Sequence, residues 1–118
     1  HYTTAYDLYL ILEEFSKHDL AYIIDSLTTY DFTYTDADGN EQVVTIEPTN
    51  EYLTGEMNLP DGYSIGSWKT GTTEEALNCL IMELKNESTG HEYVAIIAGA
   101  DGKEALYSLM TSMINTAK

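Results

Sequence analysis

The chain has 118 residues, with five lysines, no arginine and twenty acidic residues, and its formal net charge is −15. Such a charge repels phosphate backbones and anionic lipid surfaces, so we exclude nucleic-acid binding. A hydrophobic fraction of 43% excludes a disordered acidic tail and predicts one soluble globular domain, or part of one. The longest apolar run, residues 94–99, is far shorter than the roughly 20 residues of a membrane span, so we expect no membrane segment.

The first quarter of the chain, residues 1–29, is predicted to be a pair of helices. Thr4 and Asp7 have the spacing of a capping box and introduce a helix over residues 4–17. Asp19 is placed to cap a second helix after a tight connection. We expect each helix to bury the apolar face that its periodicity defines. These faces are Leu8, Ile11, Leu12 and Phe15 in the first helix, and Leu20, Ile23, Ile24 and Leu27 in the second.

The second segment, residues 30–61, is predicted to be a β-hairpin followed by a loop. Apolar and polar residues alternate over residues 30–35, the polar residues 36–40 form a turn, and a second strand follows around residues 43–46. Residues 47–61 contain both prolines of the chain and have the composition of a loop. We expect this loop to lead from one subregion to the next.

The last segment, residues 62–118, is predicted to be an antiparallel meander and a helix. Strand patterns cover residues 63–72, 78–85 and 92–99, and Asp101 is placed to cap the helix. An apolar stripe on this helix is expected to cover one face of the sheet, and it consists of Leu106, Leu109, Met110, Met113 and Ile114. The predicted fold class is therefore α/β: an antiparallel sheet with a C-terminal helix on one face, preceded by a helical pair and a β-hairpin.

Three features of the sequence could indicate a metal or a reactive thiol, and each has a simpler interpretation. Asp36, Asp38, Asn40 and Glu47 follow a calcium-loop spacing, but the glycine stands at position four instead of six and the flanks are strands, which favours a polar turn. His1, His18 and His91 lie far apart without a cysteine at ligand spacing. Cys79, the single cysteine, is predicted to be a buried structural thiol. We expect neither a metal nor a cofactor.

The most specific motif is the tripeptide Lys69-Thr70-Gly71 at the end of the first meander strand. Penicillin-binding proteins and serine β-lactamases carry Lys-Thr-Gly on a sheet strand, beside a Ser-x-x-Lys box and a Ser-x-Asn box. A tripeptide alone is common by chance. Its place on a predicted strand makes it informative.

Other segments extend this resemblance in the order that the family has them. Residues 1–8, residues 49–53, residues 69–80 and residues 92–100 together resemble the C-terminal part of the serine D-alanyl-D-alanine carboxypeptidases, the low-molecular-weight penicillin-binding proteins. Two residues depart from the family pattern: Trp68 stands where a small residue is usual, and Leu77 stands where glycine is usual. The resemblance implies a partial β-lactamase/transpeptidase-like fold, with two further strands supplied by an N-terminal region of the parent domain.

Both serine boxes are absent from the sequence, since no serine precedes a Lys or an Asn at the required spacing. The chain is therefore expected to be the C-terminal portion of a larger enzyme and not a complete catalyst. Ser67, two residues before Lys69, is the one stand-in nucleophile that the strand pattern offers, and it lacks a dedicated base. We expect the chain alone to be catalytically inert.

The resemblance assigns roles to four residues. It implies that Lys69 and the hydroxyl of Thr70 hold the terminal D-Ala carboxylate, and that Gly71 lets the ligand backbone lie close to the strand. It further implies that Thr72 provides an oxyanion-hole N–H, which would be its catalytic role. The ligand would be a peptidoglycan stem peptide or a β-lactam, running beside the strand outside the cytoplasm of a bacterium.

Two alternatives to a carboxypeptidase stay open at this point. One is a non-catalytic binding or structural domain derived from the same fold, and the other is a serine β-lactamase. In addition, the strand over residues 92–99 would have an open edge without the N-terminal region, which predicts self-association into a homo-oligomer.

Overall fold

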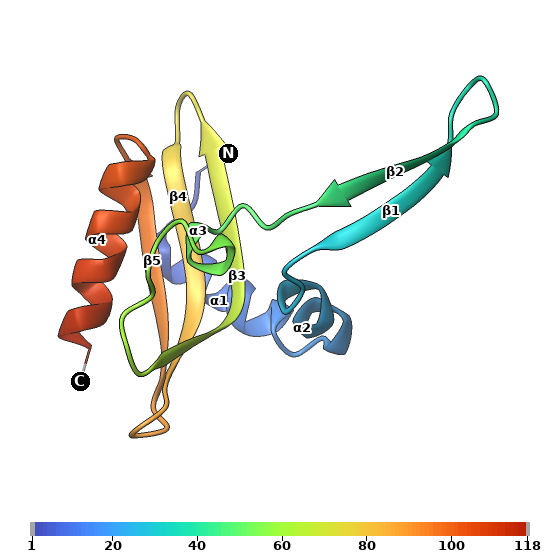
Figure 1. The fold of residues 1–118 in the computed structure, drawn as a ribbon. Helices are drawn as coiled ribbons and strands as arrows, with labels where there is room; N and C mark the ends of the chain where they lie inside the picture. The colour runs from blue at the N-terminus through green and yellow to red at the C-terminus, as the bar shows by residue number, and fades with distance from the viewer. Residues whose placement is uncertain (1, 118) are drawn as a thin grey trace.

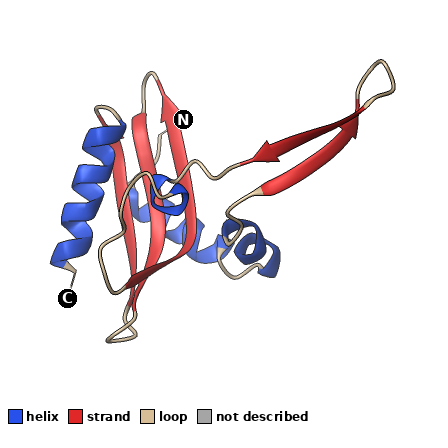
Figure 2. Ribbon diagram, viewed as in Figure 1, coloured by secondary structure: helices blue, strands red, loops and turns tan. Residues whose placement is uncertain are grey.

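The computed structural model describes residues 2–117, so His1 lies outside the described part. A three-stranded antiparallel sheet forms its centre, with α4 against one face and α1 behind the sheet in Figure 1. A two-stranded hairpin projects away from this body (Figures 1 and 2). The predicted α/β class and the order of its elements are confirmed.

The N-terminal helix α1 (Ala5–Phe15) begins as its sequence predicts. The hydroxyl of Thr4 accepts a hydrogen bond from the Asp7 backbone N–H at 3.1 Å, and the Asp7 carboxylate accepts one from the Thr4 N–H at 3.0 Å. This capping box satisfies two N–H groups that a helix otherwise leaves unpaired at its start. Leu12 is buried, whereas Ile11 and Phe15, both expected in the buried face, are exposed.

The second helix, α2 (Asp19–Asp25), is present, but the prediction that its apolar face is buried is wrong. All four residues of that face are between 40% and 68% exposed: Leu20, Ile23, Ile24 and Leu27. The helix turns Ala21 inward and holds strand β3 through Asp25, so the described residues provide no layer over its apolar side. Asp19 is also the first helical residue and not a residue preceding the helix. Periodicity defines an apolar face but not what covers it.

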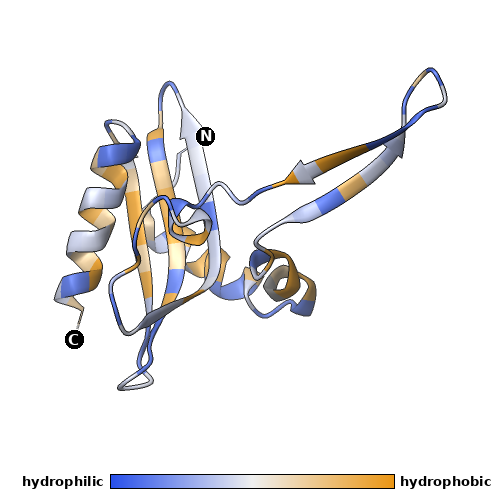
Figure 3. Cartoon of the chain, in the orientation of Figure 1, coloured by the Kyte–Doolittle hydropathy of each residue, from blue (hydrophilic) through white to orange (hydrophobic). Residues whose placement is uncertain are grey.

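The predicted hairpin is confirmed as β1 (Tyr30–Thr35) and β2 (Glu41–Ile46), with Phe32 opposite Val44. All residues of both strands are exposed, although Figure 3 shows hydrophobic residues within the hairpin. The pairs Tyr30–Ile46 and Phe32–Val44 place apolar residues on one face. In the turn, the Asp36 carboxylate accepts hydrogen bonds from the backbone N–H groups of Asp38 and Asn40 at 3.0 and 2.9 Å. The hydrogen bond from Asn40, together with those from the Gln42 side chain and from Asp38, lowers the pKa of Asp36, as expected for a polar turn.

A short helix, α3 (Glu51–Thr54), interrupts the segment that was predicted to be a loop throughout. The side chain of Asn50 caps it by accepting a hydrogen bond from the Tyr52 N–H at 3.2 Å, and Gly55 ends it with a φ of 81°. Four residues are too few to show a helical period in the sequence, which explains why the prediction missed this helix.

The predicted meander is confirmed as β3 (Tyr63–Thr73), β4 (Leu77–Asn86) and β5 (Glu92–Ala100). The order is β3-β4-β5, so β3 and β5 are the two edge strands among the described residues. Self-association through the free edge of β5 stays a prediction.

The C-terminal helix α4 (Lys103–Thr116) packs on the sheet, but its register differs in part from the prediction. Four residues of the helix are buried: Leu106, Tyr107, Met110 and Ile114. Leu109, which was expected in the stripe, is 52% exposed, and Tyr107 lies in the core instead. Gly102 precedes the helix without a side-chain hydrogen bond, so the expected cap at Asp101 is wrong. None of the helices described over residues 2–117 is long and apolar enough to cross a membrane.

Leu77, at the start of β4, has a φ of 55° and is the one non-glycine residue of the described chain with a positive φ. This conformation costs an L-residue roughly 1–2 kcal/mol, and the family pattern has glycine here. We expect Leu77→Gly to raise the free energy of unfolding by about 0.5–1 kcal/mol, after the entropy that glycine adds to the unfolded chain. Urea denaturation measures this change.

The matched control for Leu77 is Ala76→Gly, because Ala76 has no positive φ. Glycine there relieves no strain and is expected to lower stability by up to about 1 kcal/mol. Equal losses for the two variants would contradict the strain at Leu77.

Candidate functional site

The four residues of the Lys-Thr-Gly region line one hollow of about 350 Å³ beside α3 and α4. They occupy β3, where Lys69 lies opposite Ile81 and Thr72 lies opposite Asn78. The other edge of β3 pairs with no strand among residues 2–117. The structure thus brings Lys69, Thr70, Gly71 and Thr72 together next to an accessible strand edge.

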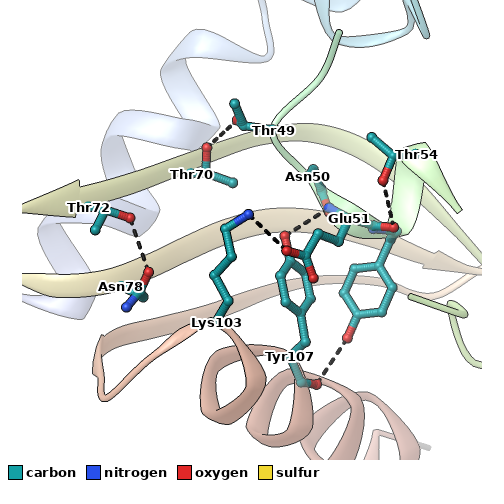
Figure 4. A network of polar contacts seen from close by, with 10 residues as sticks. Thr49, Asn50, Glu51, Thr54, Thr70, Thr72, Asn78, Lys103 and Tyr107 are labelled. Atoms are coloured by element: carbon teal, nitrogen blue, oxygen red, sulfur yellow. Dashed lines mark hydrogen bonds and ion pairs between the residues drawn. The ribbon is translucent and has the colours of Figure 1, made fainter. Parts of the chain in front are cut away.

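Lys69 is the cation that the hollow exposes. Its Nζ donates a hydrogen bond to the carbonyl oxygen of Thr70, and no carboxylate of the described residues forms an ion pair with it. Thr49 lines the same hollow, and its Oγ1 lies 2.5 Å from Oγ1 of Thr70 (Figure 4). One ammonium group and two hydroxyl groups therefore lie at the strand edge. Because the two hydroxyl groups share one hydrogen bond, the ammonium group and one of the hydroxyl groups can donate to an anionic oxygen.

Gly71 and Thr72 complete the strand motif. A Cβ built on Gly71 meets no atom within 4 Å, so no neighbour within the described chain requires glycine at this position. The space over Gly71 is open to a ligand backbone. The hydroxyl of Thr72 donates to Oδ1 of Asn78 at 3.2 Å, which fixes this side chain between β3 and β4. The oxyanion-hole role of the Thr72 N–H stays a prediction.

Lys103, the first residue of α4, is a second cation of the hollow that sequence reasoning missed. Its Nζ lies 2.9 Å from Oε1 of Glu51, and this hydrogen bond, together with the charge of Glu51, raises the pKa of Lys103. Figure 4 shows Lys103 reaching from α4 toward Glu51 on α3. No local signal could have revealed the pair, because its members come from distant parts of the sequence.

A buried pair of tyrosines fixes α3 against α4. The hydroxyl of Tyr107 accepts a hydrogen bond from the Glu51 N–H at 2.8 Å, and the hydroxyl of Tyr52 lies 2.7 Å from Oγ1 of Thr111. The two rings meet edge to face with centroids 5.1 Å apart. Burial raises the pKa of both tyrosines, so each stays a neutral hydrogen-bonding group. These contacts hold the segment that positions Thr49 over Thr70.

Ser67 is not placed as a nucleophile. It is 2% exposed, its backbone N–H donates to Oε2 of Glu83 at 3.2 Å, and its side chain hydrogen-bonds Asp25. The register of β3 shifts between Ile65 and Trp68, next to this residue. Ser67 is therefore buried against the Asp25 carboxylate and is not accessible to a ligand.

Trp68, which differs from the pattern of the family that the sequence resembles, has a clear structural role. Its indole N–H donates to the carbonyl oxygen of Asp25 at 3.1 Å, and its backbone N–H donates to the Asp25 carboxylate at 3.2 Å. These two hydrogen bonds join α2 to β3 directly beside Lys69. A small residue could make only the second of them.

Asp25 is predicted to make stability depend on pH. Burial raises its pKa above the ordinary value of 3.8, and the nearby charge of Glu83 adds to this effect against the opposing hydrogen bonds of Trp68 and Ser67. The folded chain therefore binds the proton more tightly than the unfolded chain. The resulting stabilisation is present below the ordinary pKa and is lost as the pH rises through the raised value.

Asp25→Asn removes this titration and keeps a side-chain acceptor for the Trp68 N–H. We expect the melting temperature of the variant, minus that of the parent, to be larger near pH 7 than near pH 4. Asp61→Asn, at an exposed position before β3, is the control for the loss of one carboxylate elsewhere in the chain. Parallel curves for the Asp25 variant and the parent would contradict the prediction.

The remaining candidates from the sequence are Cys79 and the histidines. Cys79 is half-buried and lines the hollow, so the prediction of a buried thiol is wrong, and its Sγ lies 3.4 Å from the carbonyl oxygen of Ala76. His18 and His91 are exposed. Within residues 2–117, no group of three or more His, Cys, Asp or Glu residues could hold a metal ion.

Comparisons with protein-family models, with curated proteins and with solved structures found no match for this chain. The functional assignment therefore depends on the geometry of the hollow and on the sequence resemblance. The geometry contributes a cation and two hydroxyl groups at an open strand edge.

Proposed function

We propose that this chain supplies the substrate-carboxylate strand of a serine-type D-alanyl-D-alanine carboxypeptidase. Such an enzyme trims peptidoglycan stem peptides outside the bacterial cytoplasm and is acylated by penicillins. The observation that carries the proposal is the position of Lys69: it lies without an ion pair among the described residues, lines the same hollow as Thr70, and belongs to β3, whose outer edge is free.

Electrostatics supports a carboxylate as the ligand. The chain as a whole repels anions because its net charge is −15, so an anionic ligand needs a local cation to bind. Lys69 provides that charge, and the hydroxyl of Thr70 provides a second donor. A ligand peptide whose terminal carboxylate binds Lys69 can continue along β3 as an added strand, and its backbone can approach β3 closely over Gly71.

The nucleophile in this proposal comes from residues outside the given sequence. Acyl transfer needs an activated serine and a base, and the sequence has neither a Ser-x-x-Lys nor a Ser-x-Asn box. In the proposed parent fold, which is β-lactamase/transpeptidase-like, a further strand pairs with the free edge of β5. The chain alone is then expected to bind ligand without cleaving it.

Nuclear magnetic resonance titration of the chain tests the proposal. The ligand is diacetyl-L-Lys-D-Ala-D-Ala, and its control is the same peptide with a C-terminal amide, which lacks the carboxylate. We expect the carboxylate form to shift the backbone amide signals of Lys69 to Thr73 and the amide form to leave them nearly unchanged. Equal shifts with both peptides, or shifts confined to other elements, would overturn the proposal.

A non-catalytic binding domain is the second candidate, and the lack of both serine boxes in the given sequence agrees with it. It shares the carboxylate hollow and differs in having no serine nucleophile in the natural protein. The DNA upstream of the His1 codon distinguishes the two: a Ser-x-x-Lys box there supports the enzyme, and its absence supports the binding domain. A serine β-lactamase would have the box but would turn over penicillin faster than the D-Ala-D-Ala peptide.

Intact mass after incubation with a fluorescent penicillin tests whether the chain alone is inert. An unmodified mass is expected, because Ser67 is buried and the penicillin cannot reach its hydroxyl. A stoichiometric adduct would show a nucleophile within these residues and would overturn this part of the proposal.

A further inference from the structure

We infer that Glu51 sets the charge selectivity of the hollow. By neutralising Lys103, it leaves Lys69 as the one uncompensated cation among the described residues that line the hollow. The hollow then favours a ligand that ends in a single carboxylate over a ligand that ends in two. This inference depends on the proposed function and adds to it the charge class of the ligand.

In the ion pair between Glu51 and Lys103, Glu51 is the partner that the surrounding structure holds in place. The side chain of Glu51 is only 14% exposed, whereas that of Lys103 is 65% exposed. The Glu51 backbone is held as well, since its N–H donates to the buried hydroxyl of Tyr107 at 2.8 Å. The carboxylate of Glu51 is therefore held close to the hollow, and the more exposed side chain of Lys103 extends to it.

The charges around the hollow favour a ligand with one terminal carboxylate over a ligand with two. Lys69 and Lys103 are the two cations of the lining, and Glu51 compensates one of them. The first ligand carboxylate can bind Lys69. A second carboxylate finds Lys103 already paired, lies near the negative charge of Glu51, and adds to the repulsion from a chain of net charge −15.

Three variants and two ligands test the inference by titration of the chain at low salt. The ligands are diacetyl-L-Lys-D-Ala-D-Ala, with one carboxylate at its end, and diacetyl-L-Lys-D-Ala-D-Glu, with two. Glu51→Gln frees Lys103 and is expected to improve binding of the D-Glu peptide two- to five-fold relative to the D-Ala peptide. Lys103→Met leaves Glu51 unpaired and is expected to weaken both ligands, with the larger loss for the D-Glu peptide. The double variant is expected to return the ratio to its parent value.

The controls change net charge by the same amount away from the hollow. Glu41→Gln lies on the projecting hairpin, and Lys85→Met lies near the far end of β4. Neither is expected to change the ratio of the two affinities. If Glu51→Gln fails to fold, two other measurements test the inference. One is the ratio of the two peptide affinities in Lys103→Met, and the other is the salt dependence of this ratio in the parent.

The outcomes separate this inference from the proposed function. If the parent binds the D-Ala peptide no better than its amide, the proposed function fails and the inference fails with it. If the parent binds the carboxylate through Lys69 but the ratio of affinities is the same in Glu51→Gln as in the parent, the inference alone is overturned. The inference is supported if Glu51→Gln increases the affinity for the D-Glu peptide relative to the D-Ala peptide and the double variant reverses this increase.

Discussion

Lys69→Met is expected to weaken binding of the D-Ala-D-Ala peptide by about 10- to 100-fold, because a hydrogen bond to a charged group contributes roughly 1.5–3 kcal/mol. The loss arises when the ligand fills the hollow and removes water from the contact. Methionine keeps the length of the side chain and removes the charge. The peptide titration described above measures the change.

Lys85→Met is the matched control for Lys69, since it makes the same substitution on the neighbouring strand and lowers the net charge equally. It is expected to change the affinity less than two-fold, because long-range charge effects on the surface are small. A similar loss in both variants would show that net charge, and not the position of Lys69, determines binding.

Met110→Ala is expected to lower the free energy of unfolding by about 2–5 kcal/mol, because it leaves a cavity between α4 and the sheet. Met110 is completely buried in the cluster that contains Leu80 and Met82 of β4. Urea denaturation followed by circular dichroism measures the loss.

Leu109→Ala, at the adjacent position of α4, is the control for the orientation of the helix. The Leu109 side chain is largely exposed, so its truncation is expected to cost less than about 1 kcal/mol. A larger loss for Leu109 than for Met110 would mean that α4 turns the other side to the sheet, as the apolar stripe in the sequence would allow.

The elements with a regular period could be predicted from the sequence. Strands β3, β4 and β5 agree with their predicted ranges to within one or two residues at each end, and the capping box of Thr4 and Asp7 starts α1 as expected. In these segments the local signal and the tertiary structure favour the same conformation. Short-range sequence patterns are then sufficient.

The predictions from the sequence are wrong where tertiary contacts determine which residues are buried. On α4 the core contains Tyr107 and not Leu109. The Tyr107 hydroxyl accepts a hydrogen bond from the Glu51 N–H, a contact that no period in the sequence records. The apolar face of α2 has the helical spacing but no covering layer among the described residues. A pattern reports which side of a helix is apolar, and the arrangement of the whole chain decides whether that side is buried.

The candidate site was predictable only in its contiguous part. Lys69, Thr70, Gly71 and Thr72 follow one another on a strand, so the motif alone places them together. Lys103 and its partner Glu51 belong to two helices that are far apart in the sequence, and only the packing of α4 against α3 brings them together.

Trp68 makes the contact between α2 and β3 visible to spectroscopy. It is the single tryptophan of the chain, it is half-buried, and its indole N–H binds the carbonyl oxygen of Asp25. Selective excitation of this residue therefore reports on one junction, while far-ultraviolet circular dichroism reports on the whole fold. If α2 separates from β3 before the sheet melts, the emission of Trp68 shifts to longer wavelength at a lower urea concentration than the dichroism changes.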